Sequence, residues 1–229
     1  MRILALDTAL AACSAAVWRD GEILARRMET MARGQSEALM PMVIAAVAEA
    51  GVAFSELDRL AVTVGPGSFT GLRIGLAAAR GMALALGLPV VGVTTLEAVA
   101  YGVEAEARAG RSLLVALDAG RADLYLQIFG ADLSENTPVS AALPGAVPAM
   151  LPEGPLVVAG NGAARLRDVL GRRADIRFAE GLGLPDAAQV AAIAATRGPA
   201  RAPGDGLEAP APLYLHPSYA KLPKRGERR

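Results

Sequence analysis

The sequence predicts an α/β protein of two duplicated lobes, each holding a mixed β-sheet flanked by helices. Three observations indicate this fold. Three strand-like segments joined by short turns open the chain, and strands and helices alternate after them. The same order of elements returns in the second half, where Ala116-Leu117-Asp118 repeats the Ala5-Leu6-Asp7 that ends the first strand.

The first half of the chain supplies five strands and two long helices. Apolar runs and an Asp20-Gly21 turn predict antiparallel strands over residues 2–6, 13–18 and 22–29. The elements that follow are a helix, a strand, a glycine-rich loop, a second helix and a fifth strand, over residues 36–50, 59–64, 65–71, 72–86 and 89–93. Ser36 is the expected N-cap of the first helix.

The second half repeats this order with shorter elements. The expected strands and helices cover residues 113–117, 122–129, 156–159, 163–170 and 186–196. Residues 134–155 are rich in Pro, Ala and Gly, which predicts an irregular loop. We divide the chain into an N-terminal lobe over 1–103, a smaller C-terminal lobe over 104–212 and a tail over 213–229, whose basic end we expect to be flexible.

The composition excludes several classes of protein. The 229 residues carry no formal net charge, which argues against bulk electrostatic binding of nucleic acid. A hydrophobic share of 53% excludes a disordered chain. With one Cys and one His, the chain can form neither an internal disulfide nor a multi-His zinc site. No signal peptide or membrane-spanning run is visible, so we expect a cytoplasmic protein.

The segment GPGSFTGLRIG, over residues 65–75, is the most distinctive motif. Its glycines allow close backbone approach, and backbone N–H groups at the start of a helix can bind an anion. Carboxylates at strand ends can hold a metal–nucleotide. These features predict a nucleotide site at Asp7, Thr8, Gly65, Gly67 and Ser68. A tight structural turn, with Asp7 bonded to its own backbone, explains the same residues without a ligand.

Small residues form a stripe along the second predicted helix. Gly71, Gly75, Ala79 and Ala83 recur every four residues, which lets another helix approach closely. The stripe can serve a contact with another protein, and it can equally serve packing on the chain's own sheet. If it is a contact surface, Arg at Gly75 or Ala79 should abolish pairing and leave the fold intact.

Several segments together resemble the TsaB family, also called YeaZ, the bacterial subunit required for threonylcarbamoyladenosine formation in tRNA. The resemblance is carried by ILALDTALAACSAAVW (3–18), SEALMPMV (36–43), GPGSFTGLRIG (65–75), GLPVVGVTTLEAVA (87–100) and PLYL (212–215). It implies an actin-like ATPase (ribonuclease-H-like) fold and a non-catalytic scaffold role. The complex it implies transfers threonylcarbamoyl to the adenosine beside the anticodon, with catalysis in the larger paralogue TsaD.

The resemblance also implies partners. A TsaD homologue pairs with this chain to form a heterodimer, and a TsaE homologue supplies an ATPase. The chain forms a homodimer when it is alone. It contacts tRNA indirectly, through the complex. We expect this chain to bind no metal, no membrane and no cofactor. We assign ATP binding to the assembled complex rather than to this chain alone. The family's contact surface on the first two helices corresponds here to Leu39, Met42, Val43, Ala46, Gly71, Gly75, Ala79, Met82 and Ala83.

Three positions depart from the family pattern. Gln35 stands where His is usual, Gly120 takes the place of an Arg, and His216 replaces an Arg in the tail. Two alternative functions remain open. Asp7-Thr8 and the glycine loops also suit a free-standing actin-like or sugar-kinase-like ATPase, and the chain could instead be a homodimer that serves an unrelated partner. An older metallopeptidase label for relatives is disfavoured, since no zinc ligand set exists.

Overall fold

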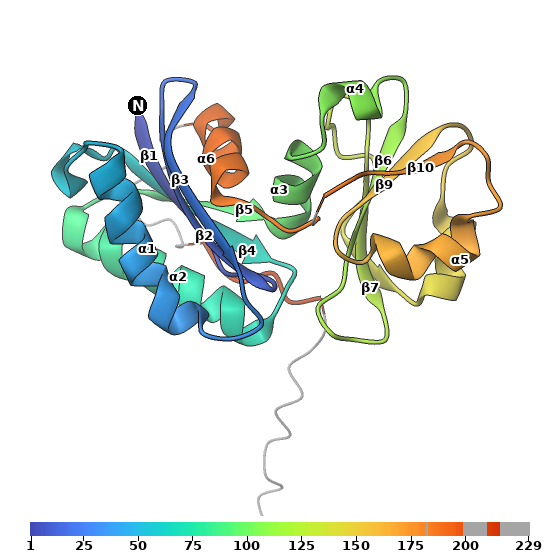
Figure 1. Ribbon diagram of the computed structural model, residues 1–229, viewed down its shortest axis with the longest axis horizontal. Helices are drawn as coiled ribbons and strands as arrows, with labels where there is room; N and C mark the ends of the chain where they lie inside the picture. Colours follow the sequence, from blue (N-terminus) through green and yellow to red (C-terminus); the bar gives the residue numbers. More distant parts are fainter. Residues whose placement is uncertain (182, 199–209, 216–229) are drawn as a thin grey trace, which may run out of the picture.

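A computed structural model describes residues 1–181, 183–198 and 210–215, which form two lobes side by side (Figure 1). The first lobe contains the strands β1 Arg2–Asp7, β2 Ala12–Arg19, β3 Glu22–Thr30, β4 Arg59–Gly65 and β5 Val90–Thr94. These strands lie in the order β3-β2-β1-β4-β5. β1 pairs antiparallel with β2 and parallel with β4, so the sheet is mixed, as predicted.

The second lobe repeats this topology. Its strands are β6 Ser112–Leu117, β7 Leu124–Phe129, β8 Ser140–Ala142, β9 Leu156–Ala159 and β10 Ile176–Phe178. They lie in the order β10-β9-β6-β7-β8, which is the first order read backwards once each strand is numbered within its lobe. β6 is antiparallel to β7 and parallel to β9. The predicted duplication and the actin-like fold class are therefore confirmed.

Two strands and a short helix were missed in the second half. β8 and η2 Pro144–Met150, a 3₁₀ helix, fall inside residues 134–155, where we predicted irregular loop. β10 was not predicted at all. Both missed strands are three residues long, too short to show a period-2 pattern, and each is held at a sheet edge by one neighbour. The predicted helix over 163–170 is a 3₁₀ turn, η3 Ala163–Leu166, followed by one α-helical turn, α5 Arg167–Leu170.

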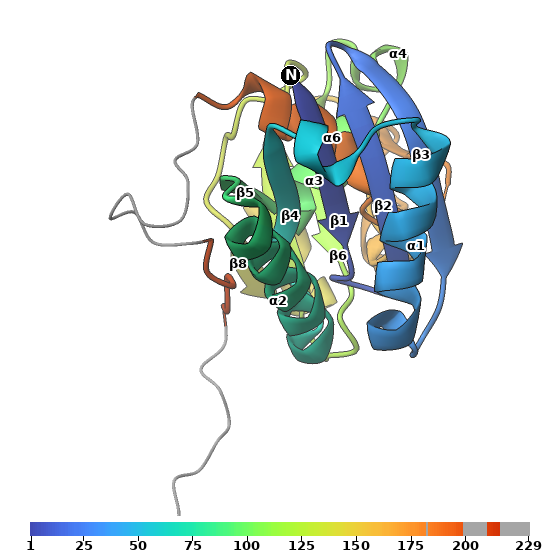
Figure 2. The ribbon, with the colours of Figure 1, turned by 90° about the vertical axis from the view of Figure 1, so that its left-hand side faces the viewer.

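Two long helices cover one face of the first sheet (Figure 2). They are α1 Gln35–Glu49 and α2 Phe69–Leu86. The predicted cap of α1 is wrong: Gly34, in a left-handed conformation, precedes the helix, and no side chain caps it. α2 begins three residues earlier than predicted, because the Ser68 hydroxyl accepts a hydrogen bond from the Gly71 N–H and caps it.

The other face of the first sheet packs against α3 Thr95–Tyr101 and α6 Ala187–Thr196, which lie between the two sheets (Figure 1). Thr94 and Glu97 form a capping box at the start of α3, and the Asp186 side chain caps α6. Val190 and Ala191 of α6 belong to the same apolar core as Ile3 of β1. The boundary at residues 103 and 104 stays a prediction, but α6 packs on the first lobe although we assigned residues 104–212 to the second.

The remaining helices are short. They are η1 Phe54–Glu56, a 3₁₀ helix, and α4 Ala105–Arg108. Among the described helices, α2 alone is long and apolar enough to cross a membrane by length and composition. Its sequence contains Arg73 and Arg80, and one of its faces is buried against the sheet. Packing inside the lobe therefore accounts for much of its apolar character.

Candidate functional site

The glycine loop between β4 and α2 packs against the turn that follows β1. A Cβ atom on Gly67 would lie 2.5 Å from the Ala9 carbonyl oxygen, and one on Gly75 would lie 2.7 Å from Thr8 Oγ1. A Cβ on Gly71 would overlap the Thr8 carbonyl oxygen. The Thr8 hydroxyl in turn donates a 2.7 Å hydrogen bond to the Gly71 carbonyl. These glycines are required because two backbone segments approach each other closely.

This packing leaves little open space at the residues of the predicted nucleotide site. Asp7, Thr8, Gly65 and Pro66 are buried, and the space beside Gly67 is filled by the chain itself. Of the predicted set, Ser68 alone is exposed, and its hydroxyl caps α2. The structural-turn interpretation therefore explains the motif, and these residues do not form an open ligand cradle.

Asp7 is a fully buried carboxyl group at the end of β1. Its Oδ1 accepts hydrogen bonds from Thr63 Oγ1 at 2.7 Å and from the Ala9 N–H at 3.1 Å, while Oδ2 has no hydrogen-bond partner among the residues that the structure describes. Burial raises the pKa of Asp7 from 3.8 to about 7, against the effect of these two hydrogen bonds. Burial likewise raises the pKa of the nearby Cys13 thiol to about 11, so this buried cysteine is inert as a nucleophile at neutral pH.

The second lobe builds its own glycine loop by the same principle. A Cβ on Gly160 would overlap the Ala116 carbonyl oxygen at the end of β6. Asn161 holds the next residues in place: its Oδ1 accepts from the Asp118 N–H at 3.0 Å, and its Nδ2 donates to the Asp118 carbonyl at 2.9 Å. The Asp118 side chain accepts a hydrogen bond from the Gly120 N–H at 2.8 Å. Asp118 is thus a turn residue, as its sequence context favours.

Two of the three departures from the family pattern have a visible local role. Gln35 Nε2 donates to the carbonyl oxygens of Leu10 and Met31, so it ties the start of α1 to the β1–β2 loop. Gly120 has a φ of 76°, a conformation that glycine adopts without strain. His216 lies outside the described residues.

A cleft of about 540 Å³ lies where the loops of the two lobes face each other. It is lined by the β1–β2 loop, by the starts of α1 and α2, and by the turn around Asp118 and Asn161. Of the predicted nucleotide residues, Ser68 alone lines this cleft among the described residues. Within the described part of the chain, no three His, Cys, Asp or Glu side chains gather into a metal-binding group.

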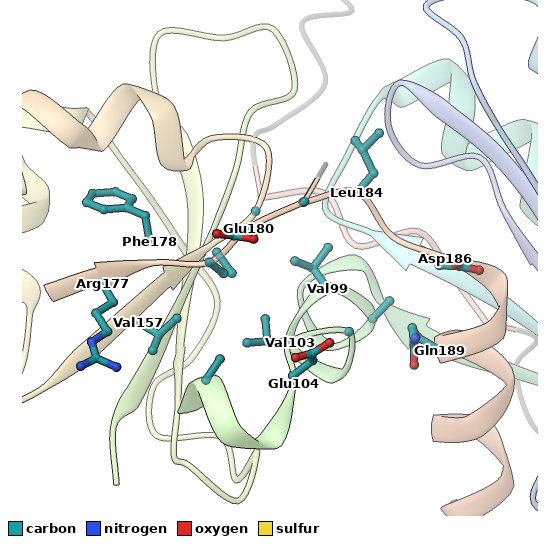
Figure 3. A pocket seen from close by; sticks show the side chains of 18 of the residues that line it. Val99, Val103, Glu104, Val157, Arg177, Phe178, Glu180, Leu184, Asp186 and Gln189 are labelled. Atoms are coloured by element: carbon teal, nitrogen blue, oxygen red, sulfur yellow. The ribbon is translucent and has the colours of Figure 1, made fainter. Parts of the chain in front are cut away.

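A second cavity of about 610 Å³ lies between β3, α3, β9 and α6 (Figure 3). Acidic side chains reach it from three elements, since Glu104 follows α3, Glu180 follows β10 and Asp186 caps α6. The Asp186 carboxylate is already engaged by Arg26 of β3 in a 2.5 Å ion pair. This ion pair fastens α6 to the edge of the first sheet, so we assign it a structural role.

Seven of the nine predicted contact residues are not on the surface. The buried ones are Leu39, Val43, Ala46, Gly71, Gly75, Ala79 and Ala83. Met42 and Met82 are partly buried and pack against the same core. The residue list for the contact surface therefore needs correction. The small stripe of α2 faces Thr8 and Val62 of the chain's own sheet, because only small side chains leave room there.

The exposed sides of α1 and α2 nevertheless carry large apolar side chains. Ile44 of α1 is 56% exposed and Leu84 of α2 is 78% exposed, and Met40, one turn before Ile44 on α1, is exposed as well. We call Met40, Ile44 and Leu84 the outer apolar face. The sequence did not reveal this face, because we interpreted the stripe of small residues on α2 as the contact surface. The available signal was that both helices are apolar on more than one side, whereas a helix with a single buried face keeps its opposite side polar.

Residues 210–215 run along the side of α2 that lies away from α1. The Leu213 N–H donates to the Val64 carbonyl of β4 at 2.7 Å, and Arg80 Nη2 donates to the Pro210 carbonyl at 2.7 Å. The Tyr214 ring lies 5.4 Å from the Phe69 ring. These contacts fix the PLYL segment on the first lobe.

Comparisons with known proteins agree on one family. A family model described as TsaD, tRNA N6-adenosine threonylcarbamoyltransferase, matches residues 23–141. The tRNA threonylcarbamoyladenosine biosynthesis protein TsaB of Escherichia coli is 42% identical over 125 residues, which are 55% of this chain and 53% of that protein. The protein of the same name from Haemophilus influenzae is 34% identical over 125 residues, 55% of this chain and 52% of that protein. The chain spans about half the length of these curated relatives.

A solved structure matches over a longer range. YeaZ from Pseudomonas aeruginosa superimposes with a TM-score of 0.75 at 30% identity, and the match covers 93% of this chain and 99% of that one. The similarity therefore includes both lobes, whereas the matches to the curated relatives cover little more than half of the chain.

Proposed function

Because this chain belongs to the TsaD family of tRNA N6-adenosine threonylcarbamoyltransferases, among its TsaB/YeaZ members, we propose that it is an accessory subunit in tRNA threonylcarbamoyladenosine biosynthesis. In this proposal it is a cytoplasmic scaffold that pairs with a TsaD homologue, and the TsaD homologue carries out the transfer. A single His in the whole sequence supports this division, since the chain cannot provide a two-His metal motif.

The observation that carries the proposal is the outer apolar face of α1 and α2. Large apolar side chains at Ile44 and Leu84 project from neighbouring helices into solvent. Exposed apolar groups on adjacent helices are typical of protein contact sites, because docking removes them from water. A partner that presents two helices of its own would pack here as in a helix bundle.

The same surface supports the other proposed assemblies. A second copy of the chain would cover it when the TsaD homologue is absent, which gives the homodimer. A TsaE homologue would then join the heterodimer and supply ATP hydrolysis, and tRNA would be met in the assembled complex. Each assembly therefore requires that the outer apolar face be exposed in the isolated chain before a partner docks.

Surface substitutions test the proposal directly. We expect Ile44→Arg and Leu84→Arg each to abolish co-purification with the co-expressed TsaD homologue, because a charge would be buried in the contact. Leu143→Arg is the matched control, since Leu143 is 57% exposed in the second lobe. All three variants should unfold within about 0.5 kcal/mol of the parent chain. Normal pairing by both α1 and α2 variants would contradict the proposal.

The ATPase alternative finds less support in the geometry. It assigned nucleotide chemistry to Asp7 and the glycine loops, but the Asp7 carboxyl is buried and bonded to Thr63 and Ala9. Turnover of Mg-ATP by the purified chain, abolished by Asp7→Ala, would restore this alternative. The proposal of an accessory subunit predicts no turnover by the chain alone.

A further inference from the structure

The flank of α2 that faces away from α1 carries an exposed cluster of aromatic and arginine side chains. The Arg73 guanidinium carbon lies 3.8 Å from the centre of the Phe69 ring, and Arg73 Nε donates a 3.2 Å hydrogen bond to the Tyr214 hydroxyl. The Phe69 and Tyr214 rings are 5.4 Å apart and tilted by 32°. We call Phe69, Arg73 and Tyr214 the aromatic–arginine cluster.

The cluster is held in place and yet stays open to solvent. Phe69 is 46% exposed and Tyr214 is 40% exposed, although the two rings touch each other. Neither terminal nitrogen of Arg73 has a hydrogen-bond partner among the described residues, since only Nε is bonded. The exposed parts of the two rings and the terminal nitrogens of Arg73 are therefore available to a ligand.

The part of the chain that contains α2 is basic. Between residues 59 and 96 the sequence has arginines and no acidic residue, and α2 contributes Arg73 and Arg80. A chain with no net charge overall thus has a positively charged helix beside the two rings.

Exposed rings combined with arginine planes match the chemistry of unpaired nucleotides. Bases that are not in a duplex stack on aromatic rings and guanidinium planes, and the phosphates pair with arginine. In double-stranded RNA the faces of the bases are stacked on one another inside the helix, so they cannot stack on these side chains. A protein partner for this basic cluster would need an acidic face.

We propose that the aromatic–arginine cluster binds an unpaired stretch of RNA. The identification of this RNA with a loop of tRNA rests on the proposed function; the RNA-binding chemistry does not. The cluster and residues 210–215 lie on one side of α2, while α1 lies on the other (Figure 2). Tyr214 and the residues 210–215 therefore lie on the opposite side of α2 from α1, whereas Leu84, one helical turn after Arg80, adjoins that side of the helix.

Binding is measured with the full chain, alone and paired with the TsaD homologue, against a fluorescent tRNA and a fluorescent unpaired oligonucleotide. We expect Tyr214→Ala to weaken binding at least about tenfold, because one stacked base is lost, and Tyr214→Phe to bind like the parent chain. The double variant Arg73→Gln/Arg80→Gln should lower the slope of log Kd against log salt concentration by about 1.4. Arg172→Gln, an exposed arginine of the second lobe, is the control and should change neither value.

Pairing with the TsaD homologue is measured on the same samples, so that the two proposals can fail separately. Unchanged RNA affinity and salt slope in the cluster variants would overturn the RNA site and leave the accessory role untouched. Loss of pairing in these variants, with RNA affinity unchanged, would show that the cluster is a protein contact. RNA binding that depends on the cluster but persists without the partner would support the RNA site even if the accessory role failed.

Discussion

The two lobes share a topology but differ on their outer faces. Each lobe has five strands in the same order, and each has a glycine loop packed on the end of its first strand. The first lobe then covers its outer face with helices of 15 and 18 residues, α1 and α2. The second lobe has η3 and α5 at the corresponding place after β9, each four residues long. The shared parts make the fold, and the unshared helices carry the proposed function.

The contrast also separates two kinds of small residue. Gly71 and Gly75 of the first lobe and Gly160 of the second are small because another part of the backbone or a buried side chain lies against them. Gly81, on the exposed side of α2, has nothing within 4 Å of the place a Cβ would occupy. Position in the packing therefore decides which glycines the fold requires.

The largest effect is expected from Gly75→Arg, which forces a long side chain against Thr8 and Val62. We expect a loss of more than about 4 kcal/mol in the free energy of unfolding, enough to unfold most of the chain. Gly81→Arg on the same helix is the control and should change stability by less than about 1 kcal/mol. Chemical denaturation measures both. Equal stability of the two variants would mean that the stripe faces solvent after all.

The second effect concerns pH and the burial of Asp7. The folded state holds the Asp7 proton more tightly than the unfolded state, because burial raises its pKa from 3.8 to about 7. The free energy of unfolding should therefore fall as pH rises from about 4 to about 7, by about 4 kcal/mol from this group. Asp7→Asn keeps the shape, removes the charge and should abolish this part of the pH dependence.

Denaturation curves of the parent chain and Asp7→Asn across this pH range give the difference directly. A stability difference between them that stays constant with pH would show that Asp7 titrates like an exposed carboxyl. The equivalent position of the second lobe, Asp118, is only half-buried and pairs with Arg165 at 3.1 Å, so Asp118→Asn should change stability far less than Asp7→Asn does.

The smallest effect is expected from Thr8→Val, which removes the hydroxyl that bonds the Gly71 carbonyl and leaves the side-chain volume nearly unchanged. We expect a loss of about 1 to 2 kcal/mol in the free energy of unfolding, since the buried carbonyl loses its added partner. Thr70→Val, exposed at the start of the same helix, should be neutral. A neutral Thr8→Val would show that this bond does not help to hold the glycine loop on β1.

The fold was predictable where the elements are long and their periodicity is clear. The three opening strands and the repeat of Asp7 at Asp118 led to the correct topology. β8 and β10 were missed because three-residue edge strands have no pattern of their own and form only when a neighbour pairs with them.

The site was predicted less well than the fold, because sequence spacing does not tell which side of a helix is buried. The stripe from Gly71 to Ala83 has the right spacing for a contact surface and the right spacing for a sheet. Only the packing against Thr8 decides between them. Leu84 lies next to the stripe in the sequence and points into solvent, so the best candidate contact residue was one position away from a predicted one.

The central claim is that the partner docks on the outer face of α1 and α2. Hydrogen exchange of the chain, with and without the TsaD homologue, tests it most directly. We expect slower exchange over residues 35–49 and 69–86 on addition of the partner, with no change over 144–170 of the second lobe. Protection confined to the second lobe, or none over α1 and α2 in a complex that has formed, would contradict the account.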